Sequence, residues 1–501
     1  MKTTSDFVLR GGRVLDASQG LDGVMDVVVV DGRIAGVGQH GAPAGCELID
    51  VSGCIVSAGW IDNHVHTYGT LGFADPDSIG IWQGVTSYVD AGGPGIASMD
   101  EFVALLGGQT VADLYAGPYI RPMGIIGAQF TEGDIRSLTG FPIPEWLDFM
   151  DAHPGVIRYL KVAALGSYGA GPLRMAKGLA EIIDVPLYGH IGEFQMQRED
   201  PSAYELFRIS QAGDMIAHPY HNSGGGILDA DGRLLPVVAD AKARGVLFDI
   251  AFGSYNFSWD VAEKAMAQGL PPDIISSDLQ QFNAIGPAYS LSHVMSVLLR
   301  LGLTLPQVVE AVTWAPAKAL RIDDRAGCLK TGMPADITVS RLEAGRFEFA
   351  DTSGVMRDAS ERFVPVRVFK RGRPHPIDLA RCQDEKNWLL QIAEDHVPAA
   401  AQALDARQKG FLRSLRRALE RTHWVYDLDH LDLRKAHELR AVFDGVRAQH
   451  DLPLREALLT VYAPFLDNPF TMQIGLFLLH LERPFLLERL DAVTGNEAVA
   501  A

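Results

Sequence analysis

Apolar runs of strand length recur along the middle of the chain, and each is followed by a helical or loop stretch. Eight such runs occur between about residues 55 and 280, namely CIVSAGWIDNHVH, GVTSYVDAG, GPYIRPMGII, VIRYLKVAAL, VPLYGHIG, DMIAHPY, GVLFDIAFG and DIISSDL. Amphipathic helices are expected between them, for example at 172–183 and 234–245. Eight buried strands alternating with helices predict an α/β fold with a (β/α)8 TIM barrel, because a doubly wound open sheet usually has fewer strands.

The segments on both sides of this middle section are rich in β-branched residues and tight turns. They include FVLRGGRVLD and DVVVVDGRIAGVG near the N-terminus, and GCLKTGMPADITVSR and VPVRVFKRGRP after the last predicted barrel helix. Such short runs separated by Gly- and Asp-containing turns are typical of antiparallel strands. We therefore expect a small β-sandwich built from residues 1–57 and 327–375, with the barrel, residues 58–326, inserted into it.

The last quarter of the chain changes character again. From about residue 376 it shows helical periodicity with few β-branched runs, punctuated by Pro398, Pro453, Pro469 and Pro484. We expect a helical extension over residues 376–501 with four or five helices. The sequence does not indicate what this extension does.

Composition and charge narrow the class of protein. A chain of 501 residues with 47% hydrophobic and 21% charged residues predicts a soluble globular enzyme of two or three folded units. The net charge of −18 disfavours nucleic acid and anionic membranes as partners, because both are polyanions. The N-terminus lacks the apolar core of a signal peptide, and no apolar stretch reaches the length of a membrane span. The four cysteines lack paired spacing, so we expect free thiols and a cytoplasmic location.

The strongest chemical signal is the H-x-H motif in AGWIDNHVH, residues 58–66. His64 and His66 are two positions apart at the end of an apolar strand, so both imidazoles should project from the same side. Two such imidazoles can chelate one metal ion. An H-x-H pair also occurs by chance on many strands, so the motif alone leaves both interpretations open.

Four further side chains close, or nearly close, other apolar runs. Lys161 lies in the fourth run, His190 in the fifth, His218 in the sixth and Asp278 in the eighth. The carboxyl ends of barrel strands face the catalytic mouth, so these groups should converge with the histidine pair. A single histidine at such a position is more often a core residue whose ring nitrogens form hydrogen bonds. The coincidence of all these positions favours a metal site.

These motifs resemble those of the amidohydrolase superfamily, and more closely its dihydroorotase-like deacetylases. The similar stretches are YLKVAAL, PLYGHIGE, IAHPYHNSGGG and GLPPDIISSDL, followed by AVTWAPAKAL and GCLKTGMPADITV. The resemblance extends over roughly residues 5–375 and leaves the helical extension outside. It implies a metal-dependent hydrolase that cleaves an amide-like bond of the N-acyl type, or a comparable ester, in a small molecule.

The resemblance also implies a binuclear metal centre. Two divalent cations, expected to be Zn²⁺, would be held by His64, His66, Lys161, His190, His218 and Asp278. A CO2-derived carbamate on Lys161 would bridge them, which requires a neutral amine such as an apolar strand favours; an ion pair of this lysine with a carboxylate is the alternative. Asp278 is the expected catalytic base, which takes a proton from the metal-bridging hydroxide or water; a helix N-cap is its alternative role.

Glu193 opens a second interpretation of the site. The segment HIGE resembles the HxxE motif of mononuclear deaminases of the same superfamily, in which a glutamate moves protons and no lysine ligand is needed. Lys161 favours the deacetylase interpretation. A cyclic amidohydrolase of the hydantoinase or dihydroorotase type also stays open, although Tyr68 stands where dihydroorotases carry an arginine. A catalytically inactive barrel with a scaffold role is the third alternative.

Loops after the predicted strands supply candidate substrate contacts. These contacts are Tyr168, Arg174, Glu193, Asn222 and Tyr255. Arg174 could hold a carboxylate, but a solvated helix charge explains it equally well. His221 is expected to line the pocket or its loop without binding a metal. We further expect a small-molecule substrate and a homo-oligomer.

Overall fold

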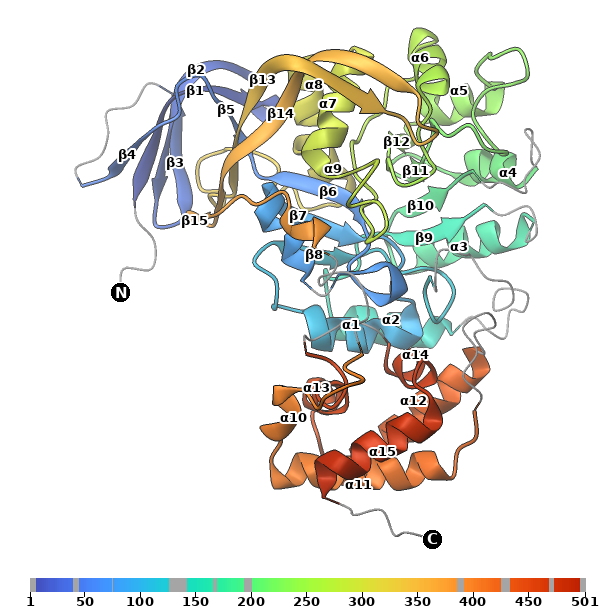
Figure 1. The fold of residues 1–501 in the computed structure, drawn as a ribbon. Helices are drawn as coiled ribbons and strands as arrows, with labels where there is room; N and C mark the ends of the chain where they lie inside the picture. The colour runs from blue at the N-terminus through green and yellow to red at the C-terminus, as the bar shows by residue number, and fades with distance from the viewer. Residues whose placement is uncertain are drawn as a thin grey trace.

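The computed structural model describes residues 6–38, 45–73, 75–125, 142–164, 169–192, 201–384, 392–424, 433–467 and 473–495. Figure 1 shows a twisted β-sheet at the upper left, an α/β body beside it, and a group of C-terminal helices beneath. The candidate site residues that the structure describes all belong to the α/β body.

One eight-stranded sheet combines the two β-rich ends of the sequence. Its strands are β1 (Phe7–Asp16), β2 (Leu21–Val30), β3 (Arg33–Gly38), β4 (Glu47–Asp50), β5 (Ile55–Ala58), β13 (Ile337–Ala350), β14 (Met356–Lys370) and β15 (Arg373–His375). The order is β15-β14-β13-β5-β1-β2-β3, and β4 pairs with β1. The antiparallel pairing of β13 with β5 sets Ile337 opposite Ala58, and Phe7 stacks on Phe369 with ring centroids 4.6 Å apart. The β-rich segments that precede and follow the α/β body in the sequence therefore share one hydrophobic core.

Parallel strands form the centre of the α/β body. One sheet contains β6 (Trp60–Val65), β7 (Val85–Asp90) and β8 (Asp113–Ala116), and the other contains β9 (Leu160–Ala163), β10 (Leu187–His190), β11 (Met215–Ala217) and β12 (Leu247–Asp249). Isolated parallel bridges continue the pairing at Ala116–Ile157, Asp249–Ile274 and Leu279–Val65. Every residue of β6 and β7 is buried, as expected of parallel strands whose two faces are both covered. The arrangement is TIM-barrel-like.

Helices cover the outside of these strands. They are α1 (Met99–Leu106), α2 (Ile143–Ala152), α3 (Gly171–Ile182), α4 (Pro201–Ile209), α5 (Pro236–Ala243), α6 (Trp259–Ala267), α7 (Leu291–Leu301), α8 (Leu305–Glu310) and α9 (Trp314–Ala319). The helices predicted from the amphipathic stretches at 172–183 and 234–245 correspond to α3 and α5. Each βα unit thus places a strand end, and the loop after it, on the same side of the body.

The third strand lies earlier than the sequence predicts. The apolar run at 117–126 was expected to form it, but β8 occupies Asp113–Ala116. Pro118 and Pro122 cannot donate backbone hydrogen bonds to a ladder, which explains why the apolar run itself does not form a strand. Tyr119 instead forms isolated bridges to Gly95 and Lys161. The predicted position of this strand was wrong.

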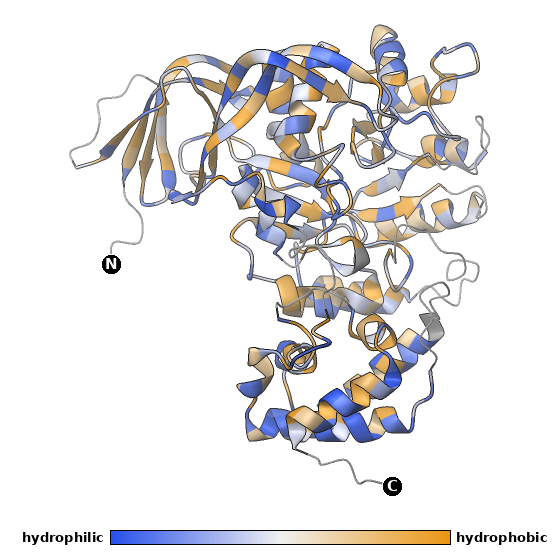
Figure 2. Ribbon diagram, in the orientation of Figure 1, coloured by the Kyte–Doolittle hydropathy of each residue, from blue (hydrophilic) through white to orange (hydrophobic). Residues whose placement is uncertain are grey.

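The C-terminal extension is helical, as predicted. Its helices are α10 (Ala399–Gln402), α11 (Ala406–Glu420), α12 (Leu433–His450), α13 (Leu454–Tyr462), α14 (Ile474–Leu479) and α15 (Arg483–Thr494). The described part of the extension therefore holds six helices, where four or five were expected. Figure 2 shows hydrophilic and hydrophobic positions interspersed along α11 and α15. In α11 the buried residues Phe411, Leu412, Leu415 and Leu419 lie on one face, as in an amphipathic helix.

A buried ion pair joins the extension to the α/β body. Glu101 in α1 is fully buried, and its carboxylate accepts hydrogen bonds from the Arg440 guanidinium of α12, from the Tyr68 hydroxyl at 3.2 Å and from the Ile474 backbone N–H at 3.0 Å. Gln473 donates to the Met123 backbone carbonyl. These contacts involve the loops after β6 and β8, so the extension supports the side of the α/β body where the carboxyl ends of the parallel strands lie.

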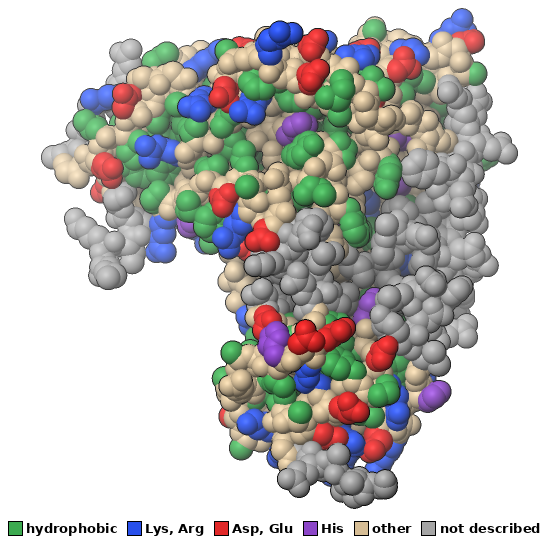
Figure 3. All heavy atoms as spheres, in the orientation of Figure 1, with side chains coloured by type: hydrophobic (Ala, Val, Ile, Leu, Met, Phe, Trp, Pro, Cys, Tyr) green, Lys and Arg blue, Asp and Glu red, His purple; other side chains and the backbone are tan. Residues whose placement is uncertain are grey.

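All four cysteines have free thiols, as their spacing predicts. Among the described residues, no helix combines the length and the apolar character that crossing a membrane requires. Acidic and basic side chains are interspersed over the face seen in Figure 3.

Replacing Arg440 by methionine should test how firmly the extension is docked. The change leaves the Glu101 carboxylate buried without its charged partner, which typically lowers the free energy of unfolding by about 3–5 kcal/mol. We expect Arg440→Met to destabilise the protein by this order in chemical denaturation. Arg417→Met, at an exposed position of α11, is the matched control and should change stability by less than about 0.5 kcal/mol. Equally small effects of both variants would show that docking does not depend on this pair.

Candidate metal centre

The H-x-H motif lies at the carboxyl end of β6, where both imidazoles face one carboxylate. His64 and His66 are almost completely buried. Their Nε2 atoms lie 3.3 and 3.1 Å from Asp278 Oδ1. The backbone N–H of Asp278 also donates to the His64 carbonyl at 2.7 Å. The alternation of the strand therefore directs the two rings to the same side, as predicted.

Two further histidines stand at the ends of two adjacent strands of the other parallel sheet. His190 closes β10 and His218 follows β11, with ring centroids 4.4 Å apart; the ring of His218 lies 5.3 Å from that of His64. His218 Nδ1 donates to the Ala251 carbonyl at 2.7 Å, and His190 Nε2 donates to the Gly192 carbonyl at 3.1 Å. Because a carbonyl only accepts hydrogen bonds, these contacts place a proton on Nδ1 of His218 and on Nε2 of His190.

Lys161 enters the same cluster from β9. Its Nζ lies 3.3 Å from His64 Nε2 and 4.4 Å from the centroid of the Tyr188 ring. The side chain is 1% exposed. Burial lowers the pKa of Lys161 to about 7, so that much of the amine is uncharged near neutral pH. Burial also lowers the pKa of His64 and of His218 well below the ordinary value, which keeps both rings neutral.

Asp278 is held in place by backbone geometry and by two amide side chains. Its φ of 50° is left-handed, as is the φ of 65° at His218, and strain of this kind often marks functional positions. Gly253 approaches so closely that a Cβ there would lie 2.3 Å from Asp278 Oδ2. Asn256 Nδ2 donates to Oδ2 and Gln280 Nε2 donates to Oδ1, each at 3.2 Å.

Asn256 and Gln280 were missed by the sequence analysis. Asn256 directly follows Tyr255, which was named as a candidate contact, and Gln280 stands two residues after Asp278. An amide side chain in a loop carries no distinctive spacing. Only its closeness to the end of a predicted strand could have drawn attention to it.

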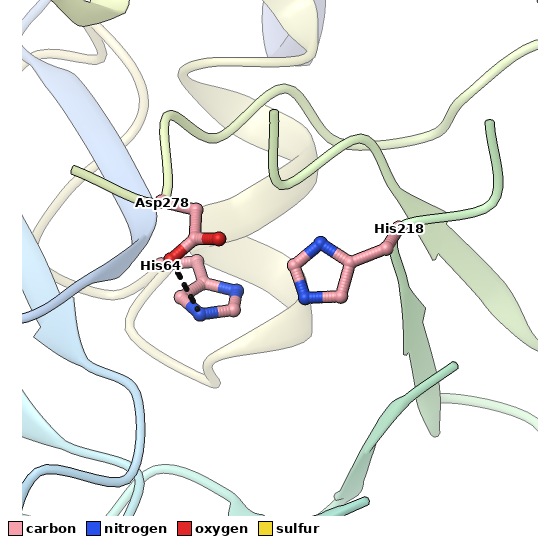
Figure 4. A group of neighbouring side chains, drawn as sticks. All are labelled: His64, His218 and Asp278. Carbon is pink, nitrogen blue, oxygen red and sulfur yellow. Dashed lines mark ion pairs between the residues drawn. The ribbon is translucent and has the colours of Figure 1, made fainter. Parts of the chain in front are cut away.

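The donor set fits a divalent cation. One ligand atom from each of His64, His218 and Asp278 lies within 4.8 Å of the others, and Figure 4 shows the three side chains pointing toward one another. A neutral imidazole nitrogen and a carboxylate oxygen both carry lone pairs, which repel one another at close range unless a cation lies between them. The buried His66 Nδ1 has no hydrogen-bond partner among the described residues. Mixed nitrogen and oxygen donors suit zinc and several other transition metals.

The residues predicted to contact the substrate, where the structure describes them, lie in different surroundings from the metal-ligand candidates. Tyr168 and Glu193 lie outside the described residues. Arg174 is exposed on α3 and pairs with Glu205 at 2.6 Å, which favours the alternative of a solvated helix charge. Asn222 is exposed and donates to Ser353 Oγ at 3.3 Å. Tyr255 is 60% exposed in the loop after β12.

Two other residues near the cluster have structural contacts of their own. His221 is buried beside Gly192, where a Cβ would come within 2.7 Å of its ring, and burial lowers the pKa of His221 to about 4. Tyr68 is buried against the Phe102 ring and donates to Glu101. Its hydroxyl is therefore directed toward α1 and the C-terminal extension.

Comparisons with known proteins agree with this geometry. Residues 251–374 match the model of the Amidohydrolase family. A deacetylase of Enterococcus faecalis is 30% identical over 378 residues, which cover 74% of this chain and 98% of the relative. The chain belongs to the amidohydrolase family. A deacetylase of Agrobacterium fabrum is 32% identical to this amidohydrolase over 343 residues, or 67% of the chain and 82% of the relative.

Solved structures extend the comparison to the fold. A crystal structure of a dihydroorotase superposes with a TM-score of 0.67 at 29% identity, covering 75% of this chain and 99% of the other. An adenine deaminase superposes with the same TM-score at 27% identity, covering 74% and 100%. This amidohydrolase is thus a hydrolase that acts on carbon–nitrogen bonds, in a family that uses divalent metals.

A methyl group at position 253 should displace Asp278 in this amidohydrolase. Gly253→Ala would bring a Cβ to 2.3 Å from Oδ2, so the carboxylate must move by about 1 Å to reach an ordinary contact distance. We expect a crystal structure of the variant to show this shift, together with a lower content of bound metal. Gly269→Ala is the control, because Gly269 also has a left-handed φ but faces open space. An unmoved Asp278 in Gly253→Ala would contradict the packing described here.

Proposed function

We propose that this amidohydrolase cleaves an N-acyl or similar amide-like bond, or a comparable ester, of a small molecule by metal-assisted attack of water. The observation that carries the proposal is the convergence of its donor side chains in one cluster, formed by His64, His66, Lys161, His190, His218 and Asp278. The deacetylase relatives, at about 30% identity, support an acyl group on nitrogen as the part that is removed.

The donor set suits two divalent cations, which we propose to be Zn²⁺. His64, His66 and Asp278 would hold one, and His190 and His218 the other. When bound, such cations polarise a scissile carbonyl and lower the pKa of an attacking water toward about 7. Ordering of the ligands comes from the chain itself, because the tautomers of His190 and His218 are set by backbone carbonyls.

Lys161 would join the two positions as a carbamate. Its neutral amine attacks CO2, a nitrogen–carbon bond forms, and one proton is released, so that the amine becomes a carbamate whose two oxygens share one negative charge. The burial of the side chain and its contact with His64 Nε2 support this role.

Asp278 is the proposed acid–base residue. Its carboxylate accepts a proton from the attacking water while the water oxygen bonds to the carbonyl carbon. The carboxyl group then gives that proton to the leaving nitrogen as the carbon–nitrogen bond breaks, which yields a carboxylic acid and an amine. Asn256 and Gln280 donate to the two carboxylate oxygens and so hold Asp278 in a fixed orientation during both transfers.

The proposal also includes the domain organisation of the chain, its partners and its location. We propose that the parallel strands and their bridges close into a (β/α)8 barrel over residues 58–326, and that the flanking β-segments, 1–57 and 327–375, form a small sandwich domain. Residues 376–501 form the helical extension. The net charge of −18 supports a small-molecule substrate in place of nucleic acid or a membrane surface. A cytoplasmic homo-oligomer completes the proposal.

Opening of a cyclic amide is the second candidate function. The superposition with a dihydroorotase favours it, because the same bond chemistry serves linear and cyclic amides. Tyr68 weakens it, since its side chain is directed toward Glu101. Deamination through a single metal would use Glu193 and would not need Lys161, whose position in the cluster argues for two metals.

Asp278→Asn should abolish turnover and leave the fold intact. The amide cannot accept and return the proton, so we expect at least a 100-fold loss of kcat, with an unchanged denaturation midpoint. The assay would use the best substrate from a panel of N-acetyl and other N-acyl amino acids, cyclic ureides and aminopurines.

The control for this experiment is Asp260→Asn, the same chemical change at an exposed carboxylate that pairs with Lys264. It should retain the activity of the wild type. Near-normal turnover in Asp278→Asn would remove this residue from the mechanism. Turnover of aminopurines alone would replace the proposed reaction by deamination.

A further inference from the structure

A buried tyrosine and a buried aspartate lie directly behind His64. Tyr188 in β10 places its hydroxyl 2.9 Å from His64 Nδ1, and the same hydroxyl donates to Asp249 Oδ2 at 2.8 Å. Both residues are fully buried. Neither belongs to the proposed ligand set, and neither stood out in the sequence.

We propose that Tyr188 and Asp249 are positioning residues that fix the tautomer and the orientation of His64, so that its Nε2 lone pair faces the metal site. The inference rests on the proposed function, because it assigns the reason for this hydrogen-bonded chain to metal binding.

The direction of the hydrogen bonds carries the argument. A tyrosine hydroxyl has one proton, and Tyr188 gives it to Asp249. The hydroxyl oxygen can then only accept from His64, which places the proton of that ring on Nδ1. Nε2 is left without a proton, and it is Nε2 that lies 3.3 Å from both Asp278 Oδ1 and Lys161 Nζ.

Asp249 is surrounded by donors, which keeps it in the accepting role. Asn63 Nδ2 donates to Oδ2 at 2.8 Å, and Ser276 Oγ donates to Oδ1 at 2.6 Å. The backbone N–H of Ala251 adds a bond to Oδ1 at 3.3 Å. With both carboxylate oxygens engaged by donors, the Tyr188 proton is drawn toward Asp249 and away from His64.

Two other histidines of the cluster are oriented in a different way, which shows what the hydrogen bonds of Tyr188 and Asp249 contribute. His190 and His218 are oriented by backbone carbonyls, which no side-chain substitution removes. The ring of His64 is oriented by a hydrogen bond to a side chain, that of Tyr188, so its orientation can be tested by mutation. Loss of such an outer partner typically weakens metal binding by about 10–100-fold.

The chain offers a matched control for this test. Tyr159 is also fully buried and stacks on Tyr188 with ring centroids 4.5 Å apart. Its hydroxyl donates to the backbone carbonyl of Asn63 at 2.9 Å. Tyr159→Phe therefore removes one buried hydroxyl from the same stack while leaving the contact to His64 in place.

The experiment compares the dissociation constants of Zn²⁺ for the wild type, Tyr188→Phe and Tyr159→Phe, by competition with a chromophoric chelator and with Mn²⁺ as a second probe. We expect Tyr188→Phe to bind the metal about 10–100-fold more weakly and Tyr159→Phe to bind it like the wild type. Each variant removes one buried hydroxyl, but Tyr188→Phe breaks two hydrogen bonds and Tyr159→Phe breaks one, so we expect Tyr188→Phe to lose somewhat more stability.

Equal affinities of Tyr188→Phe and wild type would overturn the inference while leaving the proposed function in place. Equal losses in both variants would also overturn it, because the effect would then be general to the stack. A wild-type protein that takes up neither metal would overturn the proposed function as well. If Tyr188→Phe does not fold, the comparison is made between Asp249→Asn and Asp249→Asn/Tyr188→Phe. Neither of these variants leaves a buried Asp249 carboxylate without the Tyr188 hydroxyl that donates to it.

Discussion

The crowding of imidazole, carboxylate and amine groups in a buried space is the constraint on which the rest of this structure depends. Buried polar groups are costly unless each has a partner, so the surroundings of such a cluster must hold every group in place. The chain meets this requirement through its backbone. Left-handed backbone at His218 and Asp278, and a glycine at position 253, place the donors where ordinary strand geometry would not.

Distant parts of the sequence contribute to this rigidity. The eight-stranded sheet joins segments from both sides of the α/β body, and β14 packs on α7 through a hydrogen bond from the Phe363 N–H to Ser296 Oγ. The C-terminal helices reach the loop after β6 through Arg440, Glu101 and Tyr68. A segment with no evident chemistry of its own is therefore connected to the residues that immediately follow the H-x-H motif.

Sequence patterns singled out these six side chains because each stands at or near the end of an apolar run, and in the structure they lie in one cluster beside the parallel strands. The same reasoning placed the third strand wrongly, since hydrophobicity does not register the N–H groups that Pro118 and Pro122 lack. It also gave Arg174 a possible substrate role, although that side chain pairs with Glu205 on the surface. The partners of Asp278 and His64 escaped notice because amide, tyrosine and aspartate side chains acquire their meaning only from three-dimensional contact.

Crystals grown with Zn²⁺ and measured at the zinc absorption edge would test the central claim most directly. The account predicts two anomalous peaks per chain within the cluster of His64, His66, His190, His218 and Asp278, about 3.5–4 Å apart as in other two-metal sites, with density for a carbamate on the lysine between them. A single peak with an unmodified lysine would contradict the binuclear centre. Peaks only outside the cluster would contradict the assignment of the site itself.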